Sequence, residues 1–483
     1  MSNKYSEGNY FNSKQKTNRI VKGSGYFASR YLIGFISNFA GMIVITRSLG
    51  PSIWGYYYIS FVLINIFAFL SLGGWGWIIQ ERGDLSTHQR GTSALVQQLI
   101  IFSWVLISLF VIEPLLAWRY GSPDLRFLIY AAVVGGYCYS WRYLIVAYGE
   151  RRLLYAAAGV VQIVDVAVFN ICAIIGITLH YGLLGLVVGN VLRGIISMIV
   201  AWVLVRPRLA LNWDRKVARE VIRYSVPFIS SNLLQWLPIN AGPLVAGTFV
   251  GSVTMGYLSL AYRLIEYPRV IVTLIFRMSI SVLAQHKGDS QGFNRAVEHT
   301  LQLLYLLLTP SIFILAALSP WWVRIVYGKQ WALVSVVMIL VATPYLITAG
   351  YNILATALNA WGAVKPAMRY QLIYNLVYWS ALLGFVKEWG WLGLPMSEWV
   401  IIFMGIIIWR DYKRICGKLN NPKIVLPVLI APAIMCSAWL MCAYGHLLVA
   451  ISVTAIFVTA WLIVLDAKGH ARQILYAYTS RAG

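Results

Sequence analysis

Long apolar segments alternate with short polar loops along nearly the whole chain. A helix needs about 20 predominantly apolar residues to cross a bilayer, and these runs are too evenly apolar for barrel strands. The pattern therefore predicts an all-α polytopic membrane protein with about fourteen transmembrane helices. The predicted spans are 24–46, 56–80, 94–118, 125–148, 154–179, 182–205, 221–247, 253–283, 299–323, 332–360, 367–388, 391–409, 424–444 and 447–465.

The composition agrees with this pattern. Of the 483 residues, 60% are hydrophobic and 11% are charged, whereas a soluble domain has about half its residues apolar and about a quarter charged. These values exclude a globular enzyme, a disordered chain and a secreted disulfide scaffold. The 5 cysteines lie in or beside apolar segments without metal-ligand spacing, so we expect neither disulfides nor a metal site. The polar N-terminus lacks the apolar core of a cleavable signal peptide.

The basic residues indicate how the chain is oriented in the membrane. The formal net charge is +23, and lysines and arginines concentrate in alternate loops, as the positive-inside rule describes for cytoplasmic loops. The distribution predicts that both termini are cytoplasmic. Because membrane topology accounts for the positive charge, we do not expect nucleic acid as a partner.

Paired motifs indicate an internal repeat. Because six spans separate the matching motifs, the repeats run parallel and are related by an axis along the membrane normal. The pairs, in chain order, are Gly50-Pro-Ser-Ile-Trp-Gly-Tyr56 with Gly251-Ser-Val-Thr-Met-Gly-Tyr257, Tyr120-Gly121 with Tyr327-Gly328, and Ala147-Tyr148-Gly149 with Ala360-Trp361-Gly362.

The repeat predicts a division of the chain into two lobes of six spans, with two appended spans. The predicted limits are 1–23 for a cytoplasmic tail, 24–205 for the N-lobe, 206–220 for a cytoplasmic inter-lobe loop, 221–409 for the C-lobe, 410–423 for a cytoplasmic loop, 424–465 for the appended spans and 466–483 for a cytoplasmic tail.

Three of these loop regions carry a family resemblance. Arg47-Ser-Leu-Gly-Pro-Ser-Ile-Trp-Gly-Tyr-Tyr-Tyr58 resembles the first outer loop of the polysaccharide-transport branch of the multidrug/oligosaccharidyl-lipid/polysaccharide exporter superfamily. Val326–Trp331 and Ala355–Pro366 resemble the segments before and after that family's span 10. The resemblance covers about residues 20–410.

Membership of this branch would have consequences for both structure and function. The resemblance implies a bacterial inner-membrane flippase, not an enzyme, for undecaprenyl-pyrophosphate-linked oligosaccharide units of O-antigen or exopolysaccharide. It also implies two six-helix lobes that form a V around a central cavity and work by alternating access. Membrane lipids, and the polymerase and chain-length proteins of the same pathway, are the further partners it suggests.

Arginines within the predicted spans outnumber the acids there. Ionisable residues at membrane depth usually face a cavity or a partner, and guanidinium groups bind phosphate oxygens bidentately. The excess predicts an anionic substrate. In the related lipid-linked peptidoglycan-precursor flippases, arginines in spans 1 and 8 and just past span 1 line the cavity, and Arg30, Arg263 or Arg269, and Arg47 occupy comparable places. The candidate pyrophosphate-binding residues are Arg30, Arg47, Arg142, Arg263, Arg269 and Arg277.

Structural alternatives remain open for several of these arginines. Arg142, Arg193 and Arg277 can instead extend to the cytoplasmic headgroups. Arg263 and Glu266 are three residues apart and can form a structural ion pair. In an unbroken helix, Arg277 would share a narrow stripe with both.

Other polar and aromatic residues suggest further roles. Asp165 and Glu266 are candidates for coupling transport to H⁺ or Na⁺, with a permanent arginine pair as the alternative. Three prolines, at 227, 238 and 243, predict an interrupted seventh span. Asn232, Gln235, Tyr139 and Trp141 are candidate glycan contacts. We expect no cofactor and no catalytic residues, and the sequence contains no Walker A motif.

Two other functions remain as alternatives. A cation-coupled multidrug exporter of the same superfamily would need acids lining its lobes, and a membrane glycan polymerase or ligase typically carries a large extracytoplasmic loop. The excess of arginine and the short loops favour the flippase over both.

Overall fold

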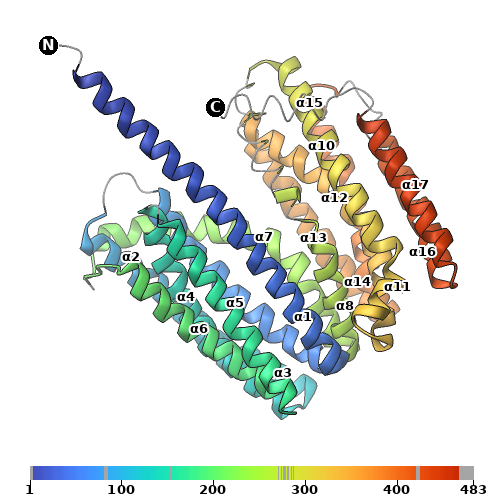
Figure 1. Ribbon diagram of the computed structural model, residues 1–483, viewed down its shortest axis with the longest axis horizontal. Coiled ribbons are helices and arrows are strands. Elements are labelled where there is room, and N and C mark those ends of the chain that lie inside the picture. Colours follow the sequence, from blue (N-terminus) through green and yellow to red (C-terminus); the bar gives the residue numbers. More distant parts are fainter. Residues whose placement is uncertain are drawn as a thin grey trace. The chain divides into compact units, whose positions relative to one another are not determined.

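The computed structural model describes residues 4–466, apart from 81–84, 153, 211, 270, 274, 276–278, 280–281, 284–285, 287 and 420–424. For residues 4–38 it describes the backbone but not the side chains. The described chain is helical and contains no strand (Figure 1). The predicted all-α class is therefore confirmed.

The helices follow one another with short connections. In chain order they are α1 (Lys4–Gln80), α2 (Thr87–Ile107), η1 (Ser108–Ile112), α3 (Glu113–Tyr120), α4 (Pro123–Arg151), α5 (Tyr155–Thr178), α6 (Leu183–Val205), α7 (Arg215–Val250), α8 (Ser252–Glu266), α10 (Ser290–Ala317), α11 (Ser319–Val326), η2 (Lys329–Trp331), α12 (Ala332–Trp361), α13 (Val364–Trp389), η3 (Gly390–Leu392), α14 (Gly393–Ile402), α15 (Gly405–Ile415), α16 (Val425–Ala443) and α17 (Leu447–Asp466).

The chain divides into two compact units, Met1–Leu233 and Leu234–Gly483, and the boundary in the sequence falls within α7. Each unit is built from helices that pack mainly against other helices of the same unit. The lobe limits expected from the sequence remain predictions.

In the first unit, α4 packs against both α1 and α6, and α6 packs against α5. Glycines allow the close approach of these helices. A Cβ on Gly194 of α6 would lie 2.5 Å from the carbonyl oxygen of Gly135 in α4, and one on Gly176 of α5 would lie 2.3 Å from the Cα of Gly185 in α6. Small residues at such crossings let backbones touch, which is how helices commonly associate in membranes.

In the second unit, α12 is the central helix and packs against α8, α10, α11, α13, α14 and α15. The two terminal helices, α16 and α17, lie side by side and pack onto α10 (Figure 1). The indole nitrogen of Trp461 donates a hydrogen bond to the backbone oxygen of Tyr305, at 3.0 Å. This bond attaches the last helix to the core of the unit.

The paired motifs of the sequence have matching backbone conformations. Gly50 has φ 75° and ψ 171°, and its counterpart Gly251 has φ 96° and ψ 170°. Gly121 and Gly328 also have positive φ values. An L side chain rarely adopts this conformation, so glycine is the natural residue at both breaks. The break at Gly50 also divides the long α1 into two helices.

The apolar surface of the described helices is that of a membrane protein. Seven helical segments are long and apolar enough to cross a membrane, and two shorter apolar helices accompany them within the described residues. Large side chains such as Phe110, Trp118, Leu376 and Ile456 expose 70% or more of their surface. In water such exposure would be costly, whereas lipid tails accommodate it. The total of about fourteen spans remains a prediction.

One predicted span differs from its helix. The expected segment 253–283 does not continue as one helix, because α8 ends at Glu266 and Tyr267 and Pro268 form a turn. Proline lacks the amide hydrogen that a continuing helix requires. The charged stripe from Arg263 to Arg277 required an unbroken helix, which the chain does not form here, and Arg277 itself lies outside the described residues.

Candidate substrate site

Arg142 lies inside the first unit, on α4. Its guanidinium Nη1 is 3.7 Å from Oδ2 of Asp165 on α5, and each side chain exposes 9% of its surface. The guanidinium carbon also lies 3.8 Å from the centre of the Tyr139 ring and 5.2 Å from that of Tyr143. Stacking on an aromatic face and pairing with a carboxylate both stabilise a buried guanidinium.

A second arginine, Arg193 of α6, approaches the same group. Its guanidinium carbon lies 4.9 Å from the centre of the Phe169 ring and 6.0 Å from that of Tyr139. No carboxylate lies within ion-pair distance of Arg193 among the described residues. We call Arg142, Arg193, Asp165, Tyr139 and Phe169 the unit-1 arginine cluster. It holds two cations and one anion.

The position of the cluster along its helices helps to decide whether Arg142 and Arg193 extend to the cytoplasmic lipid headgroups, which was the alternative predicted from the sequence. Arg193 lies 10 residues after the start of α6 and 12 before its end, which is about 15 Å and about 18 Å at the usual helical rise. Its side chain packs on rings rather than extending along the helix. Arg142 is likewise buried. This geometry disfavours the headgroup alternative for both arginines.

Hydrogen bonding within the cluster is incomplete. Nε of Arg142 and Oδ1 of Asp165 are buried and have no hydrogen-bond partner among the described residues. Buried polar atoms of this kind are uncommon and are often found at functional sites. The cluster thus combines excess positive charge with unused hydrogen-bonding capacity.

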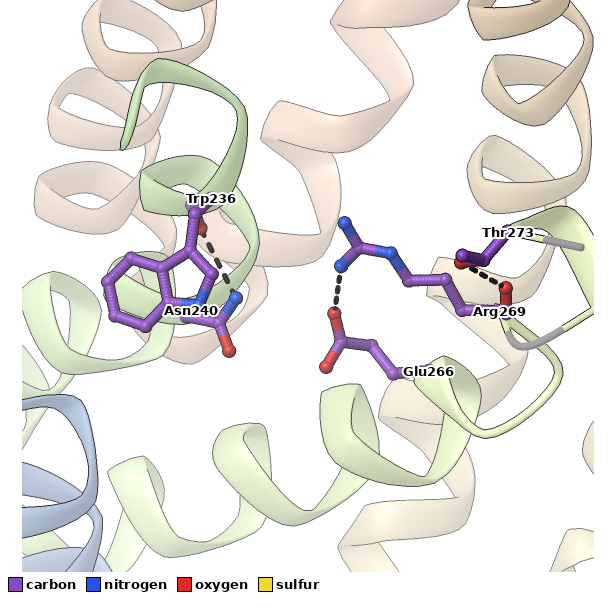
Figure 2. Close-up of polar contacts among 5 residues, drawn as sticks. All are labelled: Trp236, Asn240, Glu266, Arg269 and Thr273. Atoms are coloured by element: carbon purple, nitrogen blue, oxygen red, sulfur yellow. Dashed lines mark hydrogen bonds and ion pairs between the residues drawn. The ribbon is translucent and has the colours of Figure 1, made fainter. Parts of the chain in front are cut away.

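A second charged group lies at the end of α8 in the second unit (Figure 2). Glu266 forms an ion pair with Arg269, with 2.7 Å between Oε1 and Nη1. The ion pair expected from the sequence joined Glu266 to Arg263. In the structure Glu266 pairs with Arg269 instead. Arg263 is partly buried and hydrogen-bonds with Tyr267 in the turn.

Helix α7 carries a polar and an aromatic side chain, Asn240 and Trp236, near this group in the view of Figure 2. Figure 2 shows the Glu266 and Arg269 side chains extending toward the side on which Trp236 and Asn240 lie. Nδ2 of Asn240 donates to the backbone oxygen of Trp236 at 3.2 Å. Despite its prolines, α7 runs as one helix from Arg215 to Val250, so the predicted interruption of the seventh span was wrong.

The remaining predicted residues either lie apart from both groups or fall outside the described residues. Arg47 is exposed, three residues before the break at Gly50, and Trp141 packs against the hydrophobic core of the first unit. Arg277 lies outside the described residues, as do the side chains of Arg30, Asn232 and Gln235. Their assigned roles remain predictions.

Sequence reasoning left two residues out of the candidate site. Arg193 was known to lie within a span, but only the tertiary structure places it beside Arg142. Glu398 of α14 lies within the predicted span 391–409, and its O–H donor, Tyr262, comes from a distant segment. For both, the available signal was an ionisable residue within an apolar run.

These features define a class: an all-helical, two-unit membrane protein with arginines within its helices. The chain belongs to the family described as "Polysaccharide biosynthesis protein", whose model matches residues 44–336. The chain is 22% identical over 377 residues to the teichuronic acid biosynthesis protein TuaB of Bacillus subtilis (strain 168), covering 74% of this chain and 76% of that one. It is 19% identical over 401 residues to the lipopolysaccharide biosynthesis protein WzxC of Escherichia coli (strain K12), covering 81% and 80%.

Solved structures with the same fold include transporters. The lipid II flippase MurJ, in an inward closed conformation, superimposes with a TM-score of 0.71 at 15% identity, covering 91% of this chain and 98% of that one. A multidrug resistance MATE family transporter in an inward-facing conformation gives a TM-score of 0.62 at 14% identity, covering 82% and 99%. The family match confirms the predicted polysaccharide-transport resemblance, and the likeness to these solved structures shows that the chain has the same fold.

Proposed function

We propose that this protein is a flippase that translocates undecaprenyl-pyrophosphate-linked oligosaccharide units across the bacterial inner membrane, for O-antigen or exopolysaccharide assembly. It works by alternating access, with both termini in the cytoplasm and the two lobes divided near residues 206–220. The family and the names of the relatives support polysaccharide biosynthesis and transport.

The unit-1 arginine cluster is the observation that carries this proposal. The cluster holds two guanidinium groups but one carboxylate, which pairs with Arg142, so among the described residues the positive charge of Arg193 is not compensated by an ion pair. An apolar core tolerates such a charge poorly unless an anion binds it. Pyrophosphate oxygens suit guanidinium groups, because the planar fork donates two parallel hydrogen bonds.

The other predicted residues extend the proposed path. Arg30, Arg47, Arg263, Arg269 and Arg277 supply further positive charge for the head group. Asn232, Gln235, Tyr139 and Trp141 are proposed to contact the sugars, since amides hydrogen-bond to hydroxyls and aromatic rings stack on sugar faces. The polyprenyl tail stays in the lipid throughout.

The multidrug-exporter alternative is less well supported. Export of cationic drugs requires carboxylates that are available to bind them. Asp165 and Glu266 each face an arginine instead, which leaves Glu398 as the one acid of α8 and α14 without an ion pair among the described residues. The described loops are also short, which disfavours a polymerase with a large catalytic loop.

The experiment that tests this function locates the lipid-linked units in a strain from which the gene is deleted. The flippase proposal predicts that these units accumulate on the inner leaflet, measured by their resistance to a membrane-impermeant glycan-modifying enzyme added to intact spheroplasts. Accumulation on the outer leaflet would instead indicate a polymerase or ligase. Normal export in the deletion strain would contradict the proposal.

A further inference from the structure

The acids in the described helices have contrasting partners. Glu113 pairs with Arg126 at 3.1 Å, and Asp165, Glu266 and Asp411 likewise each face an arginine. Glu398 of α14 differs, because the group that bonds to its Oε1 is the neutral phenol of Tyr262, which donates at 3.4 Å. Among the described residues, no Lys, Arg or His lies within ion-pair distance of Glu398.

Tyrosines surround this carboxyl from two of the helices packed near it. Tyr262 approaches from α8, and Tyr374 of α13 lies close enough to interact with it electrostatically. Tyr378, one turn after Tyr374, stacks on it with the ring centres 6.3 Å apart and also interacts with Tyr262.

The charged groups nearby are already engaged with one another. Arg269 interacts electrostatically with Tyr374, but its ion pair is with Glu266. The α12 tyrosines face other groups: Tyr345 interacts with Glu266 and Arg269, and Tyr351 donates to the backbone oxygen of Ile402 at 3.1 Å. Thus, among the residues that the structure describes, no cation forms an ion pair with Glu398.

We propose that Glu398, with Tyr262 and Tyr374, forms a proton-binding site in the second unit. An uncompensated carboxylate within a membrane helix is costly, and binding a proton removes the charge. A metal cation such as Ca²⁺ fits less well. Such an ion requires several oxygen ligands, of which more than one is a carboxylate or carbonyl group directed at the ion. Glu398 is partly exposed rather than fully enclosed, as a group that exchanges protons must be.

The tyrosines also connect this site to α7. The hydroxyl of Tyr378 donates to the backbone oxygen of Pro238 at 2.7 Å, and both residues are buried. Pro238 lacks an amide hydrogen, so the helix is already weakened there. Uptake or release of a proton at Glu398 changes the hydrogen bonding of Tyr262 and the field at Tyr374 and Tyr378. In a flippase this change would bias the conformation of α7, an inference that rests on the proposed function.

Proton binding is measured first, without any transport substrate. Infrared difference spectra of the full-length protein in nanodiscs, recorded across a pH step in H₂O and D₂O, should show the carbonyl band of a protonated carboxyl. The band should be absent in Glu398→Gln and should shift in Tyr262→Phe, which loses the hydrogen bond. The matched control is Glu388→Gln, an exposed acid on α13, which should retain it. An unchanged band in Glu398→Gln would overturn the proposal.

Coupling is measured second, in proteoliposomes that contain undecaprenyl-pyrophosphate-linked oligosaccharide extracted from the deletion strain. The measured quantity is the ratio of translocation rates with and without an imposed pH gradient. This ratio should exceed one for the wild type and Glu388→Gln and fall to one for Glu398→Gln. A wild-type ratio in Glu398→Gln would refute the coupling role. Absence of translocation by the wild type would count against the proposed function instead, and the infrared band would still decide whether Glu398 binds a proton.

Discussion

At the scale of single residues, the first unit uses aromatic rings to hold arginines within its helices. Tyr139 lies under the guanidinium of Arg142, and Phe169 lies near that of Arg193. A ring face attracts a cation without neutralising it. Arg193 therefore keeps its positive charge for an incoming anion, whereas Arg142 is also held by Asp165. This difference makes Arg193 the arginine whose removal should be most informative.

Replacing Arg193 with alanine should weaken substrate binding by about 10- to 100-fold, because a hydrogen bond to a charged group contributes about 1.5–3 kcal/mol. Arg193→Lys should lie between alanine and the wild type, since lysine retains the charge but loses the planar fork. The measurement is the concentration dependence of translocation in proteoliposomes. Arg208→Ala, which removes an exposed arginine from the 206–220 loop, serves as the control. Equal effects of Arg193→Ala and Arg208→Ala would argue against a site at Arg193.

At the scale of helices, two features govern the positions of the charged groups. Proline ends α8 next to Glu266, and glycine contacts bring α4, α5 and α6 close together. The first places Arg269 beyond the helix end, where it reaches Glu266. The second brings Arg142, Asp165 and Arg193 of three different helices into one cluster. Helix packing and helix breaks, rather than spacing along the chain, therefore determine which charges meet.

The glycine contact between α5 and α6 gives a stability prediction. Gly176→Ala places a methyl group 2.3 Å from the Cα of Gly185, so the helices must separate, at a cost of about 1–3 kcal/mol for overpacking. We expect a lower melting temperature of the purified protein in detergent. Gly384→Ala on α13, where a Cβ meets nothing within 4 Å, should be neutral or slightly stabilising, because alanine favours the helix. Equal melting temperatures for the two variants would show that this contact is unimportant.

At the scale of the whole molecule, the two helical units and the family assignment both support the proposed role as a transporter. The backbone breaks at Gly50 and Gly251 have the same conformation, one in each unit, as expected for a duplicated design. The predicted parallel repeats of six spans would begin on the same side of the membrane. The basic loop between them should therefore lie on the same side as the N-terminus.

Reporter fusions test this topology. A fusion after Arg208 or Arg219 should be active as a cytoplasmic reporter and inactive as a periplasmic one, because the many basic residues of this loop resist translocation. Fusions at Gly121 and Gly328, in the paired loops, should both give the opposite result. Periplasmic activity at Arg208 or Arg219 would contradict the predicted orientation.

The sequence alone determined the class of the protein and most of its helices, because crossing a bilayer imposes a length and an apolarity that can be seen in one chain. It also identified the glycine breaks and the arginine excess. Only the tertiary structure decided which charges are partners: Arg142 with Asp165, Glu266 with Arg269, and Glu398 with Tyr262. These contacts join helices far apart in sequence or cross a break at Pro268. Helical periodicity describes one unbroken helix. It therefore carries no information about contacts between helices or across a helix break.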